Sequence, residues 1–171
     1  YGVRAHTYPV DLSLDRGPGL LFARVQKNAP AADVLVNNAG VIAYGNFHEL
    51  SLEKQEAIVR INALAYLKLM RLFLPGMVRA GEGRVLNVVS AAAFQPTVHQ
   101  AVYGAAKAMV QSLSEAVGQE LRGTGVRICT LNPSYTDTPL LGEKNFPKRS
   151  WWYAVSGLGD PAVVARKGFK D

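Results

Sequence analysis

The pair of residues with the clearest chemical potential is Tyr103 and Lys107. Of the seven tyrosines, only Tyr103 is followed four residues later by a lysine. On a helix, positions four residues apart share a face, with Cβ atoms roughly 5–6 Å apart. An ammonium at that distance favours the phenolate, and it is expected to lower the tyrosine pKa from about 10 toward neutrality. Such a phenol can act as a general acid toward a carbonyl oxygen or as a general base toward an alcohol.

Ser90 is a candidate partner for the same chemistry. It follows the apolar run 84–89 and precedes Tyr103 in the chain. At the end of a strand, its hydroxyl could hydrogen-bond the substrate oxygen that the phenol protonates. The alternative is an exposed Tyr–Lys pair without function, because Tyr-x-x-x-Lys is a weak pattern by itself.

The elements that must position these residues alternate between strand and helix patterns. Strands are expected at 3–10, 33–36, 84–89 and 125–131. Helices are expected over 20–25, 52–80 and 103–121, with a last short one after Pro161. This alternation predicts right-handed βαβ crossovers and a parallel sheet in one α/β domain.

The long helix over 52–80 carries its own boundary signals. Ser51 is a suitable N-cap and Glu53 suits the positive end of the helix dipole. Pro75 is expected to kink or break the helix, and Gly81 and Gly83 to end it.

Small and polar residues follow each expected strand. They are Asp11, Asn37 to Gly40, Ser90, and Asn132 to Thr138. Each set taken alone is readily explained as a turn. Ligands of open parallel sheets bind at the carboxyl ends of the strands, so four such sets in succession favour a binding edge.

Taken together, these residues resemble the short-chain dehydrogenase/reductase superfamily. The matching features are Asn37-Asn38-Ala39-Gly40, Asn62, Ser90, and Tyr103 with Lys107. Their spacings agree too, at 28 (90 − 62), 13 (103 − 90) and 4 (107 − 103) residues. The segment 132–138 resembles the nicotinamide-side loop of that family. The resemblance covers nearly the whole chain and implies a Rossmann-like, doubly wound parallel sheet in a three-layer α/β/α arrangement.

The resemblance implies an NAD(P)-dependent oxidoreductase that interconverts an alcohol and a ketone or aldehyde. Tyr103 would be the general acid/base and Ser90 would orient the substrate oxygen. Lys107 would lower the pKa of Tyr103 and hydrogen-bond the nicotinamide ribose. Asn62 would hold a water that relays protons from Lys107 to solvent.

The resemblance also implies a binding site for NADP or NAD. Asp11 would accept a hydrogen bond from the adenine amino group. Asn37, Ala39 and Gly40 would line the adenosine ribose and the phosphates. The nicotinamide side would be contacted by Pro133, Thr136 and Thr138, together with Tyr103 and Lys107.

Substrate contacts are expected from residues around the catalytic group and from a lid. The stretch 139–160 would form the lid, with Trp151 and Trp152 facing a lipophilic or bulky substrate. Hydrophobic packing or a subunit contact explains these two tryptophans equally well. Phe94, Gln95 and His99 are further candidates, although His99 is better explained as a loop residue.

The sequence departs from the family pattern at its beginning. The family starts with a strand and a glycine-rich turn that binds the pyrophosphate at a helix N-terminus. Gly17-Pro18-Gly19 follows no expected strand, and Pro18 is unsuited to such a turn. We therefore expect residues 1–171 to be a single partial domain lacking the first βαβ unit of the dinucleotide half. Within it, 1–138 would be the cofactor and catalytic core.

Composition excludes several other classes of protein. The formal net charge of +6 comes from scattered lysines and arginines, which indicates a basic surface rather than a nucleic-acid interface. A single Cys129 allows no internal disulfide, and the three histidines lack metal-ligand spacing. No apolar window of about 18 residues lacks a charge, so no membrane segment is expected.

These features predict a cytoplasmic protein. By the family resemblance it would form a homodimer or homotetramer through the helices over 52–80 and 103–121. Two alternatives to an active enzyme stay open, a non-catalytic module that senses cofactor or binds a partner, and an inactive fragment.

Overall fold

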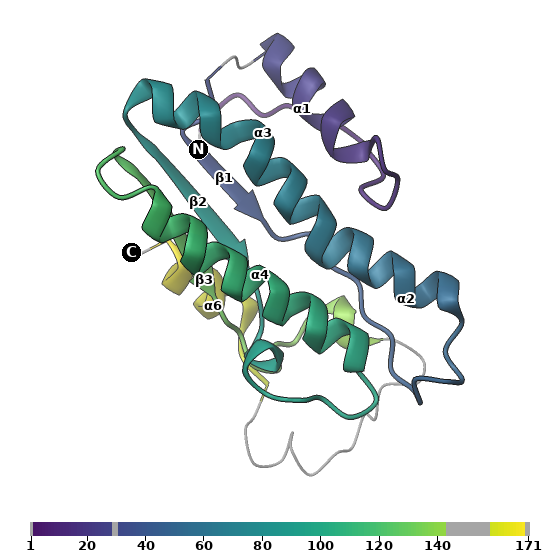
Figure 1. Ribbon diagram of the computed structural model, residues 1–171. Helices are drawn as coiled ribbons and strands as arrows, with labels where there is room; N and C mark the ends of the chain where they lie inside the picture. The colour runs from purple at the N-terminus through teal and green to yellow at the C-terminus, as the bar shows by residue number, and fades with distance from the viewer. Residues whose placement is uncertain (1, 29–30, 143–157, 170–171) are drawn as a thin grey trace.

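The computed structural model describes residues 2–28, 31–142 and 158–169. Three parallel strands form the sheet in the order β1 (Val34–Asn37), β2 (Gly83–Val88) and β3 (Val126–Leu131) (Figure 1). The crossover from β1 to β2 runs through α2 (Leu52–Val59), η1 (Arg60–Leu64) and α3 (Ala65–Ala80). The crossover from β2 to β3 contains η2 (Ala91–Phe94) and α4 (Ala101–Glu120). The parallel sheet confirms the predicted α/β class.

Helices cover both faces of this sheet. On one face α3 and α4 pack against the strands, and α1 (Gly17–Asn28) lies on the outside of α3 (Figure 1). The Phe22 and Phe73 rings meet there in an edge-to-face contact. On the other face α6 (Pro161–Gly168) brings Gly168 against Leu86 and Leu131. The result is the predicted three-layer arrangement.

The apolar side chains form two core clusters. One joins α3 to the sheet and includes Leu69, Met70, Phe73, Met77, Val85 and Val126. The other lies nearer the carboxyl ends of the strands and includes Ile42, Ile58, Tyr66, Val89, Tyr103 and Val110. Since Met70 and Met77 are buried in the first cluster, they pack inside this domain rather than on its outer surface.

The expected strand at 3–10 does not form. Residues 2–11 have no regular structure, and Val3 is 79% exposed. Strand β1 is an edge among the described residues, and its Val34 is 54% exposed. Alternation of apolar and polar residues stabilises a strand only when a neighbour supplies hydrogen bonds and covers the apolar face, and residues 2–11 have neither.

The long helix also differs from its prediction. Ser51 caps it as expected, accepting a hydrogen bond from the Lys54 amide, and Gly81 ends it with φ 75°. Pro75, however, lies inside α3 without interrupting it. The irregularity comes earlier, at η1, which is a single π-helical stretch. A proline removes only one backbone hydrogen bond, and the packed face of α3 retains the helix around it.

A buried chain of polar side chains connects the sheet to α4. Asn37 Nδ2 donates to Asn87 Oδ1 at 2.8 Å, and Asn87 Nδ2 donates to Ser114 Oγ at 2.8 Å. Ser114 in turn donates to the Val110 carbonyl at 2.6 Å. Because buried polar groups are costly when unpaired, this chain fixes the position of α4 relative to β1 and β2.

We predict that Ser114→Ala lowers the free energy of unfolding by about 1–3 kcal/mol, because the buried Asn87 amide loses its oxygen acceptor. Urea unfolding followed by circular dichroism measures the change. Ser112→Ala, on the exposed face of the same helix, is the matched control and should change stability by less than about 0.5 kcal/mol. Equal effects of the two substitutions would contradict the role of the polar chain.

Candidate active site

The irregular turn η1 directs Asn62 into the loop that follows β1. Asn62 is fully buried, and its Nδ2 donates to the Val41 carbonyl at 2.7 Å and to the Ile58 carbonyl at 3.0 Å. Its Oδ1 is buried and has no hydrogen-bond partner among the described residues. A Cβ added to Gly40 would lie 2.8 Å from this oxygen. The loop can therefore approach Asn62 this closely only with glycine at position 40.

Ser90 and Tyr103 face the same cavity from different elements. Ser90 follows the end of β2 and caps η2, where its Oγ accepts a hydrogen bond from the Ala92 amide at 3.1 Å. Tyr103 lies in the first turn of α4 and is buried. Both residues, together with Asn62 and Lys107, line a cavity of about 750 Å³ at the carboxyl ends of the strands. The structure thus brings together all four residues predicted to be catalytic.

The pKa of Tyr103 differs from its prediction. Burial raises the pKa of this phenol, and a hydrogen bond with the Ser90 side chain lowers it by a smaller amount. The expected lowering by Lys107 is wrong for this arrangement. The Lys107 Nζ lies 5.9 Å from the centre of the Tyr103 ring and donates a hydrogen bond to the Val88 carbonyl. Removal of the phenol from water therefore raises the pKa of Tyr103 more than the charge of Lys107 lowers it. Tyr103 therefore keeps its proton at neutral pH.

The ammonium group of Lys107 is buried. Lys107 is 3% exposed, and burial lowers its pKa to about 8. Nζ donates to the Val88 carbonyl at 2.8 Å and to the Tyr66 hydroxyl at 3.5 Å. No carboxylate among the described residues forms an ion pair with it. Sequence reasoning missed Tyr66, whose available signal was its position four residues after Asn62 on one helix face.

Most of the residues predicted to bind cofactor line the same cavity. Those present in its wall are Ala39, Gly40, Tyr103, Lys107, Pro133, Thr136 and Thr138. Asp11 lies outside it, on an exposed segment, and accepts hydrogen bonds from the amide and hydroxyl of Ser13. Asn37 is also outside the wall, because its side chain is buried in the bond to Asn87.

Only some of the residues predicted to contact substrate line the cavity. Gln95 lines the cavity, whereas Phe94 is 63% exposed and is not part of the wall. Trp151 and Trp152 lie outside the described residues. The wall also contains residues that the sequence analysis did not select, among them Thr97, Gln100, Val164 and Phe169, and it includes Tyr135, Leu140 and Leu141 from the predicted loop and lid.

His99 belongs to a smaller neighbouring cavity of about 190 Å³. Its backbone has φ 65°, an uncommon conformation for a residue with a side chain. Its carbonyl accepts a hydrogen bond from the Gly45 amide at 3.0 Å. His99 therefore holds the loop after β1 against the segment before α4, as a loop residue would.

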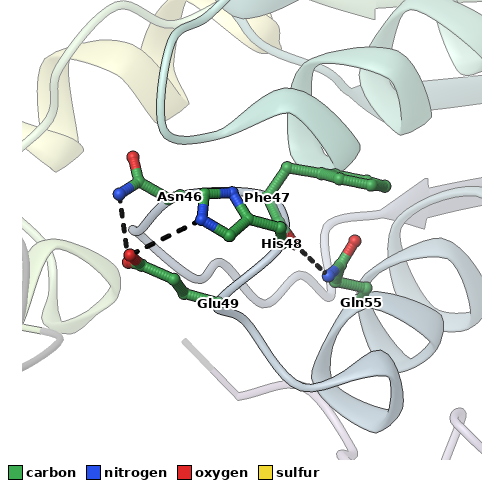
Figure 2. A network of polar contacts seen from close by, with 5 residues as sticks. All are labelled: Asn46, Phe47, His48, Glu49 and Gln55. Atoms are coloured by element: carbon green, nitrogen blue, oxygen red, sulfur yellow. Dashed lines mark hydrogen bonds and ion pairs between the residues drawn. The ribbon is translucent and has the colours of Figure 1, made fainter.

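The far end of that loop is held by α2. Figure 2 shows Gln55 directed at the turn before the helix, where its Nε2 donates to the Phe47 carbonyl at 2.9 Å. The same Nε2 also donates to the Leu50 carbonyl at 2.9 Å. Within the turn, Asn46 Nδ2 donates to Glu49 at 3.0 Å (Figure 2). Together with the bond from Asn62 to Val41, these contacts fix the loop along its length, which a cavity wall requires.

Two further classes of site find no support in the described part of the chain. Residues 2–28, 31–142 and 158–169 contain no group of three or more His, Cys, Asp or Glu side chains that could hold a metal ion. None of the helices described is long and apolar enough to cross a membrane.

Comparison with known proteins agrees with this geometry. The sequence model of a family described as short chain dehydrogenase matches residues 1–148. The chain is 37% identical over 134 residues to the ketoacyl reductase HetN of Nostoc sp. strain PCC 7120, covering 78% of this chain and 47% of that protein. It is 29% identical over 157 residues to the D-beta-hydroxybutyrate dehydrogenase of Rhizobium meliloti strain 1021, covering 92% of this chain and 59% of that protein. The chain spans about half the length of these curated relatives.

Solved structures show the same architecture. A short-chain dehydrogenase from Sphingobium yanoikuyae in complex with NADPH matches with a TM-score of 0.81 at 26% identity, covering 94% of this chain and 62% of that one. The family match extends over the strands, the loop after β1, and the helix that carries Tyr103 and Lys107. On the strength of that match, the chain belongs to the short-chain dehydrogenase family.

Proposed function

We propose that the protein is an NAD(P)-dependent oxidoreductase that interconverts an alcohol and a ketone or aldehyde, with Tyr103 as the general acid/base. One observation carries this proposal. A buried tyrosine lines a large cavity at the strand ends together with Ser90 and the buried Lys107, which lies one helical turn away. The names of the relatives, a ketoacyl reductase and a hydroxybutyrate dehydrogenase, support the same reaction class.

The residues of the cavity fit a nicotinamide cofactor. A volume of about 750 Å³ lies in the range of ligand sites, and the wall near β1 is built from the small residues Ala39 and Gly40. Lys107 has three N–H donors, of which two are directed at Val88 and Tyr66. The third would bind a ribose hydroxyl, while Thr136 and Thr138 would contact the nicotinamide side. When bound, the nicotinamide would supply or accept the hydride.

Residues of the chain itself would donate the proton and restore it. Ser90 would orient the substrate oxygen toward Tyr103, whose hydroxyl would donate its proton to that oxygen during carbonyl reduction. Because burial raises the pKa of Tyr103, the acid form predominates in the free protein, so the proton needed for carbonyl reduction is present at neutral pH. Lys107 would then stabilise the phenolate, and Asn62, whose Oδ1 has no hydrogen-bond partner in the described part of the chain, would hold a water that returns a proton.

Two segments of the chain would have different roles. Residues 1–138 would supply the cofactor and catalytic core, and 139–160 would act as the substrate lid. The presence of Leu140 and Leu141 in the cavity wall supports a lid that offers apolar contacts to the substrate. Residues 143–157, which include most of that segment, lie outside the described residues.

We predict that Tyr103→Phe reduces kcat by about 10²–10⁴-fold, because it removes the transferable proton and keeps the ring. The measurement is NADPH and NADH oxidation by the complete gene product with a panel of ketones and aldehydes. Cofactor binding, followed by fluorescence titration, should change little. Tyr8→Phe, a tyrosine outside the cavity wall, is the control. Unchanged turnover in Tyr103→Phe would contradict the proposal, and cofactor binding without turnover on every substrate would favour a sensor.

We also predict a decrease in activity above pH 8. Lys107 has its pKa lowered to about 8, so it carries its proton below this pH and loses it as the pH rises, while Tyr103 stays protonated. The kcat/KM for carbonyl reduction, which reports the free enzyme, should therefore fall through one ionisation near pH 8. Lys107→Met should lower the rate and remove this ionisation. The same pH limb in that variant would show that another group titrates.

A further inference from the structure

We propose that Tyr66 is a positioning residue that holds the ammonium group of Lys107 in place through its neutral hydroxyl and the face of its ring. This inference rests on the proposed function insofar as it concerns turnover. The geometry that supports it, and one of the measurements that test it, are independent of any reaction.

Tyr66 reaches the site from the helix that carries Asn62. It lies at the start of α3, one turn after Asn62, and is 1% exposed. Its hydroxyl lies 3.0 Å from the Ala39 carbonyl, in the loop after β1, and 3.3 Å from the Val88 carbonyl at the end of β2. The single phenolic hydrogen can serve one of these, and Val88 already accepts from Lys107 at 2.8 Å. Donation to Ala39 therefore satisfies both carbonyls.

With its hydrogen directed at Ala39, the Tyr66 oxygen presents a lone pair to Lys107. Nζ lies 3.5 Å from this oxygen and 5.0 Å from the centre of the Tyr66 ring. The same Nζ lies 5.9 Å from the centre of the Tyr103 ring, so the ammonium is within cation–π distance of two aromatic rings. Aromatic faces attract a cation at these distances, and most strongly where water is excluded.

The chemistry of a phenol suits this position. Burial raises the pKa of Tyr66, and its interaction with Tyr103 raises it further, so the hydroxyl stays neutral across the working pH range. A neutral oxygen offers the ammonium a dipole without cancelling its charge. A carboxylate at the same place would pair with Lys107 and draw its field away from Tyr103. Tyr66 thus stabilises a buried cation while leaving its charge available to the catalytic phenol.

Two roles for Tyr66 give different expectations. If Tyr66 only fills the core, its substitution should lower stability and leave the titration of Lys107 unchanged. If it holds the ammonium, loss of the hydroxyl should make the charged form of Lys107 less favourable, since an acceptor is removed from a site that desolvation already penalises. The pKa of Lys107 should then fall below that of the unsubstituted protein.

The experiment compares Tyr66→Phe, Tyr66→Leu and the unsubstituted complete gene product. NMR of ¹³C-labelled lysine, assigned with Lys107→Met, gives the pKa of Lys107 without any substrate. We expect Tyr66→Phe, which keeps the ring, to lower this pKa by about one unit, a tenfold change in the protonation constant. Tyr66→Leu, which also removes the ring face, should lower it further. The basic limb of the kcat/KM profile should move to lower pH by the same amounts.

Phe73→Leu is the matched control, because Phe73 is a buried aromatic residue on the same helix, in the other core cluster. It should lower the melting temperature and leave the pKa of Lys107 unchanged. A Tyr66→Phe protein whose Lys107 titrates as in the unsubstituted protein would overturn the inference, whatever its stability. Should Tyr103→Phe retain full turnover, the proposed reaction fails, and the NMR titration still decides the role of Tyr66.

Discussion

The structure depends on keeping a positive charge at a position largely removed from water. Lys107 is 3% exposed and lacks an ion-pair partner among the described residues, and burial lowers its pKa to about 8. A buried unpaired ammonium destabilises a fold unless oxygen atoms replace its hydration. Here the Val88 carbonyl and the Tyr66 hydroxyl supply those oxygens. The end of β2, the start of α3 and the first turns of α4 must therefore meet at one point.

The rest of the core holds β2, α3 and α4 in the positions that this contact requires. The polar chain from Asn37 through Asn87 to Ser114 fixes α4 against β1 and β2. The π-helical turn η1 places Asn62 and the adjoining Tyr66 toward the strand ends. Such turns are rare, and they occur frequently at functional sites. In this chain the irregular turn lies where the cavity wall requires two polar side chains from one helix.

Several details of the fold departed from expectation for one shared reason. Residues 3–10 have a strand pattern and no strand, Pro75 has a helix-breaking side chain and no break, and Tyr103 has a cationic neighbour and a raised pKa. Each expectation was local, taken from a residue and its near neighbours in sequence. The outcome was set by packing: the absence of a partner strand, the covered face of α3, and the exclusion of water around the phenol.

The sequence by itself determined the order of the elements, the parallel sheet, and the four side chains that line the cavity at positions 62, 90, 103 and 107. The elements and the sheet follow from periodicity, and Tyr103, Lys107 and Ser90 from residue type and spacing, whereas Asn62 was selected by the family resemblance. Only the tertiary structure decided where the Lys107 ammonium points and that Tyr66 contacts it, because these two residues lie on different helices. Charge and proton affinity depend on desolvation and on neighbours in space, and a linear sequence specifies neither until it is folded.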